Sequence, residues 1–122
     1  MKLSLPETFT ERTDSAGGDS QLSLLVAHLG IQTTAGREAL VLALENVLLL
    51  DRKQQDYGSS NISSFGAFGC VVRINDKVER LKNLYGKKRR KAINESVLDS
   101  FRDLSNYAII AHLVETNKWP KD

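Results

Sequence analysis

Three carboxylates gather on one side of a predicted helix late in the chain. Glu95, Asp99 and Asp103 are spaced four residues apart, so at about 100° per residue they lie within about 80° of one another. Carboxylates crowded in this way repel one another unless a cation or basic groups compensate their charge. The spacing therefore predicts a divalent-metal site. The alternative is that Glu95 and Asp99 simply complement the positive end of a helix that Asn94 caps.

A second carboxylate pair lies on the preceding predicted helix, at residues 66–85. Asp76 and Glu79 are three residues apart, so their side chains are neighbours on one face. If this helix packs antiparallel to the next one, the two acidic pairs converge on a single ion. Ligands that are all oxygen favour magnesium or manganese over zinc. The two histidines and the lone Cys70 stand apart from other candidate ligands and complete no zinc set.

Five consecutive basic residues, Lys87 to Lys91, separate these two helices. Without them the chain is mildly acidic, so the cluster is a local feature rather than part of a general basic surface. It is either a solvated loop or a loop that faces phosphate groups close to the carboxylates. No aromatic residue is interleaved with it and no nucleic-acid motif surrounds it, so we do not expect RNA or DNA as a partner.

Length and composition are those of one ordinary globular domain. Of the 122 residues, 41% are hydrophobic and 26% are charged, and the single cysteine excludes an intrachain disulfide. A lone cysteine also fits a reducing compartment. The polar N-terminus does not read as a secretory signal, and the longest apolar run, Ala39–Leu50, contains Glu45 and is too short to cross a bilayer. We therefore expect a soluble, cytoplasmic protein that does not act at a membrane.

The apolar pattern predicts an all-α fold, a small bundle of about four helices with short loops. Residues 1–18 are expected to form a flexible N-terminal segment ahead of a single helical domain at 19–122. The expected helices run from Ser20 to a stop at Gly30, over 35–54 after a Thr34 cap, over 66–85 and over about 95–117. The expected core stripe of the last helix is Val97, Phe101, Leu104 and Ala108. The sector that carries the carboxylates continues as Asn106, Ile110 and Leu113, so its second half is also expected to be buried.

The 35–54 helix is apolar around most of its circumference. Glu38, Glu45 and Arg52, spaced by seven residues, form its polar stripe, which is more typical of a narrow solvent edge than of a functional site. A chain this small does not enclose such a helix on all sides by itself. We therefore predict a homodimer or a higher oligomer that forms through this helix.

Four short motifs occur in order between residues 56 and 107, namely Asp56-Tyr57-Gly58, Arg73 to Leu81, Glu95 to Asp99, and Asp103 to Tyr107. In this combination they resemble the nucleotide modification associated domain family over about residues 48–116. That family is frequent in bacteriophages. The resemblance implies kinship with all-alpha nucleotide pyrophosphohydrolases of the MazG and dimeric dUTPase type. Those enzymes hold magnesium against a nucleoside triphosphate with a carboxylate pair on one helix and a Glu-x-x-Asp on the next.

The chain departs from that enzyme pattern at both motifs. Asp76-x-x-Glu79 stands in place of Glu-x-x-Glu, and Glu95-x-x-x-Asp99 is one residue longer than the second motif. Both spacings keep the carboxylates on one helix face, so metal binding is retained, whereas the position of an attacking water depends on finer ligand geometry. Glu95 and Asp99 are the expected catalytic residues. The expected Mg²⁺ or Mn²⁺ ligands are Asp76, Glu79, Glu95, Asp99 and Asp103.

Other polar and aromatic residues are candidates for binding the nucleotide itself. The residues predicted to contact phosphates are Arg73, Lys77 and Arg80. Asp56 and Tyr57 stand before a glycine that permits a sharp turn, and the Tyr57 ring can stack on a base. The same motif equally suits a helix end with a packed tyrosine. Asn106 and Tyr107 are either binding residues or buried packing groups.

Two function classes follow, and both require a phosphorylated nucleotide as the ligand. The first is a magnesium-dependent hydrolase of phage nucleotide metabolism that cleaves a nucleoside triphosphate to the monophosphate and pyrophosphate. The second is a non-catalytic protein that sequesters a nucleotide, including a host immune signalling nucleotide. Either would act in the host cytoplasm if a phage encodes it. The complete set of carboxylates favours the hydrolase, while a third reading treats the charged residues of a helical oligomer as structural.

Overall fold

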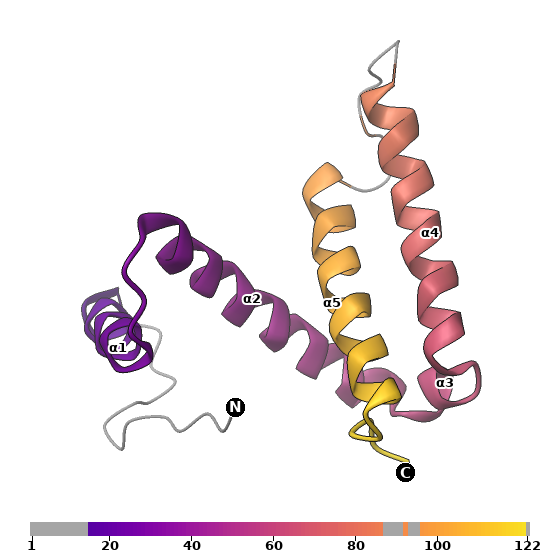
Figure 1. The fold of residues 1–122 in the computed structure, drawn as a ribbon, viewed down its shortest axis with the longest axis horizontal. Coiled ribbons are helices and arrows are strands. Elements are labelled where there is room, and N and C mark those ends of the chain that lie inside the picture. Colours follow the sequence, from indigo (N-terminus) through magenta and orange to yellow (C-terminus); the bar gives the residue numbers. More distant parts are fainter. Residues whose placement is uncertain (1–14, 87–91, 93–95, 122) are drawn as a thin grey trace. The chain divides into compact units, whose positions relative to one another are not determined.

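The computed structural model describes residues 15–86, 92 and 96–121, and every regular element in them is a helix (Figure 1). The helices are α1 (Ser15–Leu29), α2 (Thr34–Tyr57), α3 (Ser60–Ser63), α4 (Gly66–Tyr85) and α5 (Val97–Glu115). The all-α prediction is confirmed, and α3 is a short turn that the apolar pattern did not predict. Contacts divide the chain into two units, Met1–Ala43 and Leu44–Asp122, so α2 begins in the first unit and ends in the second.

In the first unit, a glycine ends α1 as predicted. Gly30 has a φ of +76°, a left-handed conformation that glycine adopts without steric cost. The backbone N–H of Gly30 donates to the carbonyl oxygen of Ala27, and that of Ile31 donates to Val26, both over 3.1 Å. This pair of hydrogen bonds is the Schellman arrangement, which satisfies carbonyl groups at the helix end.

Both helices of this unit begin at residues other than those predicted. α1 starts at Ser15 rather than near Ser20, so it includes two glycines that cost about 1 kcal/mol each in a helix. Each residue added to an existing helix also adds a backbone hydrogen bond, which offsets that cost. The rest of the predicted flexible segment, residues 1–14, lies outside the described residues. Thr33 rather than Thr34 caps α2, because its Oγ1 accepts a hydrogen bond from the Gly36 N–H over 3.0 Å.

α4 and α5 are the main packed pair of the second unit. They lie side by side and run in opposite directions (Figure 1), which is the arrangement that convergence of the two acidic pairs requires. The bounds of α4 agree with the prediction of 66–85. The buried core joins Cys70 of α4 to Ile110 of α5 and to Trp119, with partly buried side chains from α2 and α3 packed against them.

The chain after α5 folds back against the end of α2. Asn117 has a φ of +58°, and the Lys118 N–H donates to the carbonyl oxygen of Leu113 over 2.8 Å, which ends the helix. Trp119 then donates its Nε1–H to the carbonyl oxygen of Ser59 over 3.1 Å. Gln54 donates to the hydroxyl of the same serine over 2.6 Å. These contacts fix the turn between α2 and α3 against the C-terminal residues.

α5 begins at Val97 and ends at Glu115, a shorter range than the predicted 95–117. Its cap is Ser96, whose side chain accepts a hydrogen bond from the Asp99 N–H over 3.0 Å. The prediction that Asn94 is the cap is therefore wrong, since a capping serine supplies this bond two residues later. Asn94, Glu95 and the basic cluster at 87–91 lie outside the described residues.

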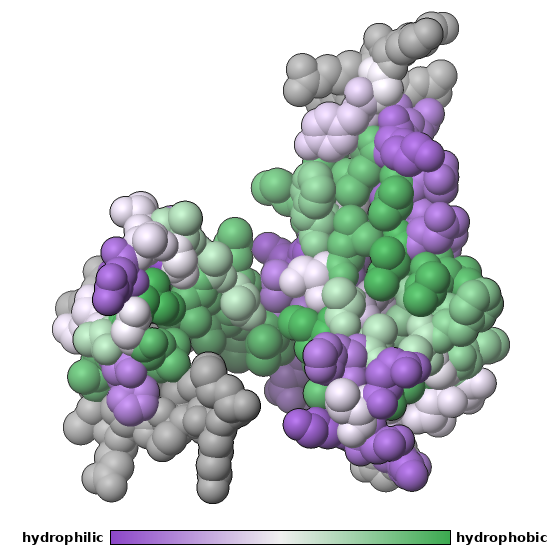
Figure 2. All heavy atoms as spheres, viewed as in Figure 1, coloured by the Kyte–Doolittle hydropathy of each residue, from purple (hydrophilic) through white to green (hydrophobic). Residues whose placement is uncertain are grey.

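The buried face of α5 is not the predicted stripe. Phe101 is 49% exposed and Ala108 is exposed, whereas Ser100 is fully buried and Asn106 and Ile110 are nearly so. Figure 2 shows the hydrophobic surface that α4 and α5 leave open to solvent. The predicted stripe is wrong at Phe101 and Ala108, whereas the prediction that the carboxylate sector is buried at Asn106 and Ile110 is confirmed. A serine is small and can hydrogen-bond, so it suits a place where α4 comes close to α5.

Candidate functional site: a basic pocket beside α5

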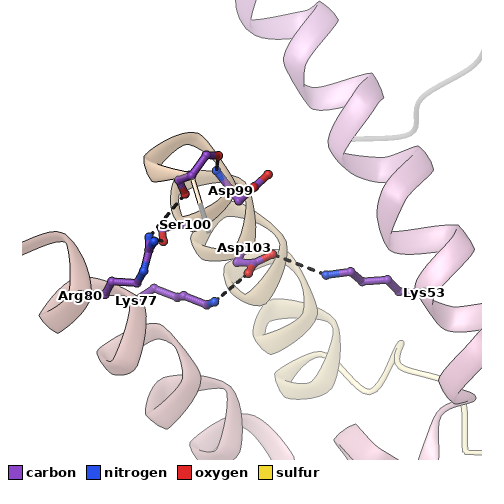
Figure 3. A network of polar contacts seen from close by, with 7 residues as sticks. Lys53, Lys77, Arg80, Asp99, Ser100 and Asp103 are labelled. Carbon is purple, nitrogen blue, oxygen red and sulfur yellow. Dashed lines mark hydrogen bonds and ion pairs between the residues drawn. The ribbon is translucent and has the colours of Figure 1, made fainter. Parts of the chain in front are cut away.

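Asp103, a predicted metal ligand, lies between two lysines (Figure 3). Its carboxylate is 3.0 Å from Nζ of Lys77 on α4 and 3.6 Å from Nζ of Lys53 on α2. The Asp103 and Lys77 side chains are only 18% and 21% exposed, so solvent screens their ion pair less than it would at an open surface. The charge of this carboxylate is thus compensated by two basic side chains. Compensation by basic groups and compensation by a metal cation are the two ways in which crowded carboxylates are stabilised.

Arg80, a predicted phosphate contact, is engaged with the first turn of α5 (Figure 3). Its Nη1 donates to Oγ of Ser100 over 2.6 Å and to the carbonyl oxygen of Ser96 over 3.4 Å. Ser100 is fully buried, so this hydrogen bond lies within the contact between α4 and α5. The guanidinium therefore ties two helices together and lines neither of the pockets described below.

The remaining predicted carboxylates are dispersed. Asp99 is exposed in the first turn of α5, and Glu79 pairs with Lys82 over 3.2 Å on the surface of α4. Asp76 is exposed and lines a pocket beside α4. Within the described residues, no three acidic, histidine or cysteine side chains are grouped so as to hold a metal ion. Glu95 lies outside that part of the chain, so the metal site stays a prediction.

A pocket of about 270 Å³ opens beside the C-terminal half of α5, and we call it the Asn106 pocket. Its apolar wall includes Leu50, Ile62, Ile110 and the Trp119 ring. The polar and aromatic residues that line it are Lys53, Gln54, Tyr57, Asn61, Arg73, Asp103, Asn106 and Tyr107. Four of the predicted nucleotide-binding residues, namely Tyr57, Arg73, Asn106 and Tyr107, are thus brought together.

Asn106 is the most constrained polar side chain of this pocket, since it is only 7% exposed. Its Nδ2 donates to the backbone carbonyl oxygen of Asn46 over 3.1 Å. Its Oδ1 is buried and has no hydrogen-bond partner in the described part of the protein. A buried acceptor without a donor costs about 1–3 kcal/mol, so the residue has a further hydrogen bond to make.

A second pocket, of about 480 Å³, lies against α4, and we call it the Phe68 pocket. It is more apolar, with Phe65, Phe68 and Val72 in its wall, and Asp76 reaches its edge. Arg73 and Tyr107 line both pockets. Arg73 is exposed and makes no ion pair or hydrogen bond with any other described residue, unlike the tightly held Arg80. Its charge is therefore available to a ligand in either pocket.

Some residues were assigned to the site that do not line it, and others were missed. Asp56 and Lys77 line neither pocket, although Lys77 holds Asp103, which does. Lys53 was missed because it lies on the helix that was assigned to assembly alone. Trp119 was missed because it comes after the last motif, although a lone tryptophan near a chain end is a signal of packing that could have found it.

These features define an all-α protein with a pocket that combines cationic and tyrosine side chains. The profile of the family described as Nucleotide modification associated domain 1 matches residues 53–114, and the chain belongs to this family. The matched segment contains every polar residue that lines the Asn106 pocket. Searches of curated proteins and of solved structures found no match. No helix in the described residues is long and apolar enough to span a membrane.

Proposed function

We propose that this protein binds a phosphorylated nucleotide in the Asn106 pocket. The observation that carries the proposal is the lining of that pocket, where Lys53 and Arg73 stand with Tyr57 and Tyr107 around one cavity. Cationic side chains form strong, charge-assisted hydrogen bonds with phosphate oxygens, and tyrosine rings offer flat apolar faces to a base. The description of the family, which associates it with nucleotides, supports the same class of ligand.

Arg73 is the residue on which we expect the phosphates to depend most. A guanidinium binds phosphate through two parallel hydrogen bonds, and this one has no described partner to give up first. Lys53 is about half exposed and its Nζ is 3.6 Å from Asp103, so its ion pair is loose and readily exchanged. Tyr57 is 67% exposed and is free to turn toward a bound base.

The test compares two arginines of the same helix, seven residues apart. Arg73→Gln should raise the Kd of a nucleoside triphosphate, measured by calorimetry, by about 10- to 150-fold, the effect of losing a hydrogen bond to a charged group. Arg80→Gln, the matched control, should leave the Kd unchanged and lower thermal stability, because Arg80 holds Ser100. Absence of binding for every triphosphate of a four-base panel, with and without magnesium, would overturn the proposal.

The hydrolase version of this proposal adds a divalent cation. Asp76 lies at the edge of the Phe68 pocket, which Arg73 also lines, so a carboxylate stands close to the expected phosphate group. Asp99 and Asp103 lie one turn apart on α5, which runs antiparallel to the α4 helix that carries Asp76. Glu95 and Glu79 would complete the set of metal ligands. In this version these carboxylates would hold Mg²⁺ or Mn²⁺, which would neutralise charge on the triphosphate, and Glu95 and Asp99 would orient the water whose attack on the phosphate releases pyrophosphate.

Two measurements separate hydrolysis from sequestration. Magnesium or manganese should raise the melting temperature by mass action, and Asp99→Asn should abolish the rise. Mass analysis should detect monophosphate and pyrophosphate with the wild type but not with Glu95→Gln. Recovery of the nucleotide intact would rule out the enzyme and support a binding protein that sequesters its ligand, such as a host immune signalling nucleotide in a phage setting.

We also propose that the protein forms a homodimer through α2. None of its residues is buried, and Leu44, Val47 and Leu48 are 37%, 49% and 53% exposed on the part of α2 that belongs to the second unit. Contiguous apolar residues of this kind mark protein interfaces. Light scattering should give a dimer mass for the wild type and a monomer mass for Val47→Glu. Val71→Glu, at an exposed apolar position of α4, is the control that should stay dimeric. A wild-type monomer at micromolar concentration would contradict the proposal.

A further inference from the structure

The unpaired Oδ1 of Asn106 specifies what the ligand must offer. The hydrogen bond from Nδ2 to the Asn46 carbonyl oxygen distinguishes the two ends of the side-chain amide, because only the nitrogen can donate to that oxygen. The atom left over is therefore an acceptor. It has almost no accessible surface, and it belongs to a residue that lines the pocket, so a ligand that pairs with it must first displace the side chains that cover it. Only an N–H or O–H donor can satisfy it. A carbonyl oxygen in the same place would bring two acceptors together, which is unfavourable.

The size and walls of the pocket indicate which part of a nucleotide reaches this acceptor. Its volume of about 270 Å³ is slightly below the roughly 300–1,000 Å³ of sites that enclose a whole small molecule. The apolar side chains of Leu50 and Ile110 and the Tyr107 ring suit a flat ring rather than a phosphate. The base is therefore the part to be enclosed, while Lys53 and Arg73 serve the phosphates.

We infer that the Asn106 pocket selects adenine or cytosine, through a hydrogen bond from the amino group at C6 of adenine or C4 of cytosine to Asn106 Oδ1. The inference rests on the proposed nucleotide binding and adds the class of base to it. Adenine and cytosine present an amino donor where hypoxanthine and uracil present a carbonyl oxygen. A buried acceptor discriminates between such pairs, because the wrong base leaves it unpaired as well as facing a second acceptor.

The experiment uses two pairs of triphosphates that differ in this one group. Calorimetry on the full chain should find that ATP binds about tenfold or more tightly than ITP, or CTP than UTP, since a well-placed base contact gives about this discrimination. The pair that shows the larger ratio distinguishes adenine from cytosine. Equal affinities within both pairs, or a preference for ITP and UTP, would overturn the inference and leave nucleotide binding in place. Failure of all four to bind would overturn the proposed function itself.

Two variants at Asn106 connect the preference to this side chain. Asn106→Leu keeps the approximate size but has no acceptor, so the ratio within each pair should fall to about one even if overall affinity drops. Asn106→Asp keeps an acceptor at the same place and should keep the ratio above one. A leucine variant that retains the full preference would overturn the inference. If a variant does not fold, the affinity ratios of the wild type still test the inference, because they are measured independently of the variants.

Discussion

The two halves of α5 differ in whether their polar side chains have hydrogen-bond or ion-pair partners. In the N-terminal half, Ser96 accepts from the Asp99 N–H, Ser100 accepts from Arg80, and Asp103 pairs with lysines of two other helices. In the C-terminal half, Asn106 has a buried oxygen without a described partner and lies beside a pocket. The half with more charges is therefore the half whose polar groups are already satisfied. The number of charged residues in a region is a poor guide to where a ligand binds, and unpaired groups are a better one.

The same contrast holds for the two arginines that face α5 from α4. Arg80 is held by Ser100 and Ser96, so its guanidinium contributes to the contact between the helices. Arg73, two turns earlier, has no partner in the described residues and lines two pockets. A ligand that recruited Arg80 would have to break existing hydrogen bonds, whereas one that recruited Arg73 would not. Arg80 therefore has a structural contact, while Arg73 is the arginine on which the proposed binding depends.

The largest expected effect is at Trp119, whose ring forms part of the wall of the Asn106 pocket beside the C-terminal half of α5. This side chain is 9% exposed, packs against Cys70 and Ile110, and donates to Ser59. Trp119→Ala should lower the free energy of unfolding by about 3–5 kcal/mol, the usual cost of deleting a large buried aromatic ring. Urea denaturation should be followed by circular dichroism, because the variant removes the only tryptophan of the chain.

Trp119→Phe is the matched control for that variant. It keeps most of the buried ring and loses the hydrogen bond to Ser59. It should therefore lower the free energy of unfolding by only about 1 kcal/mol relative to the wild type. An unfolding midpoint of Trp119→Ala equal to that of the wild type would mean that the C-terminal residues do not support the pocket. The comparison between the two halves would then lose its structural basis.

The sequence predicted the elements of this fold better than their buried faces. The bounds of α4 and the stop at Gly30 follow from local rules, the apolar spacing and the left-handed conformation that glycine tolerates. The buried face of α5 follows from them only in part. Asn106 and Ile110 lie on the sector that was predicted to be buried, whereas Ser100 is buried where α4, with Arg80, packs against α5. The pocket is harder still to predict. Ser59 and Trp119 are sixty residues apart and meet only in the folded chain.

Some of the predicted binding residues line the Asn106 pocket, and the predicted metal site stays a prediction. Tyr57, Arg73 and Tyr107, which were predicted from the short motifs, line the pocket. Asp103 was predicted to face a cation. In the structure it forms ion pairs with two lysines, one of them on α2, and helix spacing carries no information about a third helix. Spacing along one helix shows which side chains share a face, but it does not show what stands opposite.

The N-terminal half of α5 is tested by Ser100→Ala. The variant leaves the Arg80 guanidinium without its 2.6 Å acceptor inside the helix contact, so it should lower the free energy of unfolding by about 1–3 kcal/mol. Nucleotide affinity, measured by calorimetry, should stay at the wild-type value, since Ser100 lines neither pocket. Ser105→Ala, at an exposed position of the same helix, is the control that should change neither quantity. A loss of nucleotide binding in Ser100→Ala would instead place the ligand at the charged half.

Asp103 lies at the border between the halves, and Asp103→Asn distinguishes the two ways in which the site could work. If Lys53 and Lys77 bind phosphate directly, removal of the competing carboxylate should tighten triphosphate binding by about 0.5–1.5 kcal/mol without added metal. If Asp103 holds a cation instead, the same variant should weaken binding in magnesium. Calorimetry with magnesium and with a chelator gives opposite signs for the two cases, so the measurement decides between them.

The smallest expected effect concerns Cys70, which lies in the buried core with Ile110 and Trp119. Burial raises the pKa of this thiol above its ordinary value of 9.0, because the thiolate loses hydration in the apolar core. The raised pKa favours the protonated folded state, so its stabilising contribution is present below pH 9.0 and declines as the pH rises toward the folded-state value. Urea midpoints measured from neutral to alkaline pH should therefore fall more steeply for the wild type than for Cys70→Ala, which cannot ionise. The two chains share every other titrating group, so a difference in slope reports on Cys70 alone. Parallel curves would mean that water reaches the Cys70 thiol. The core around it would then be more open than its exposure of 2% indicates.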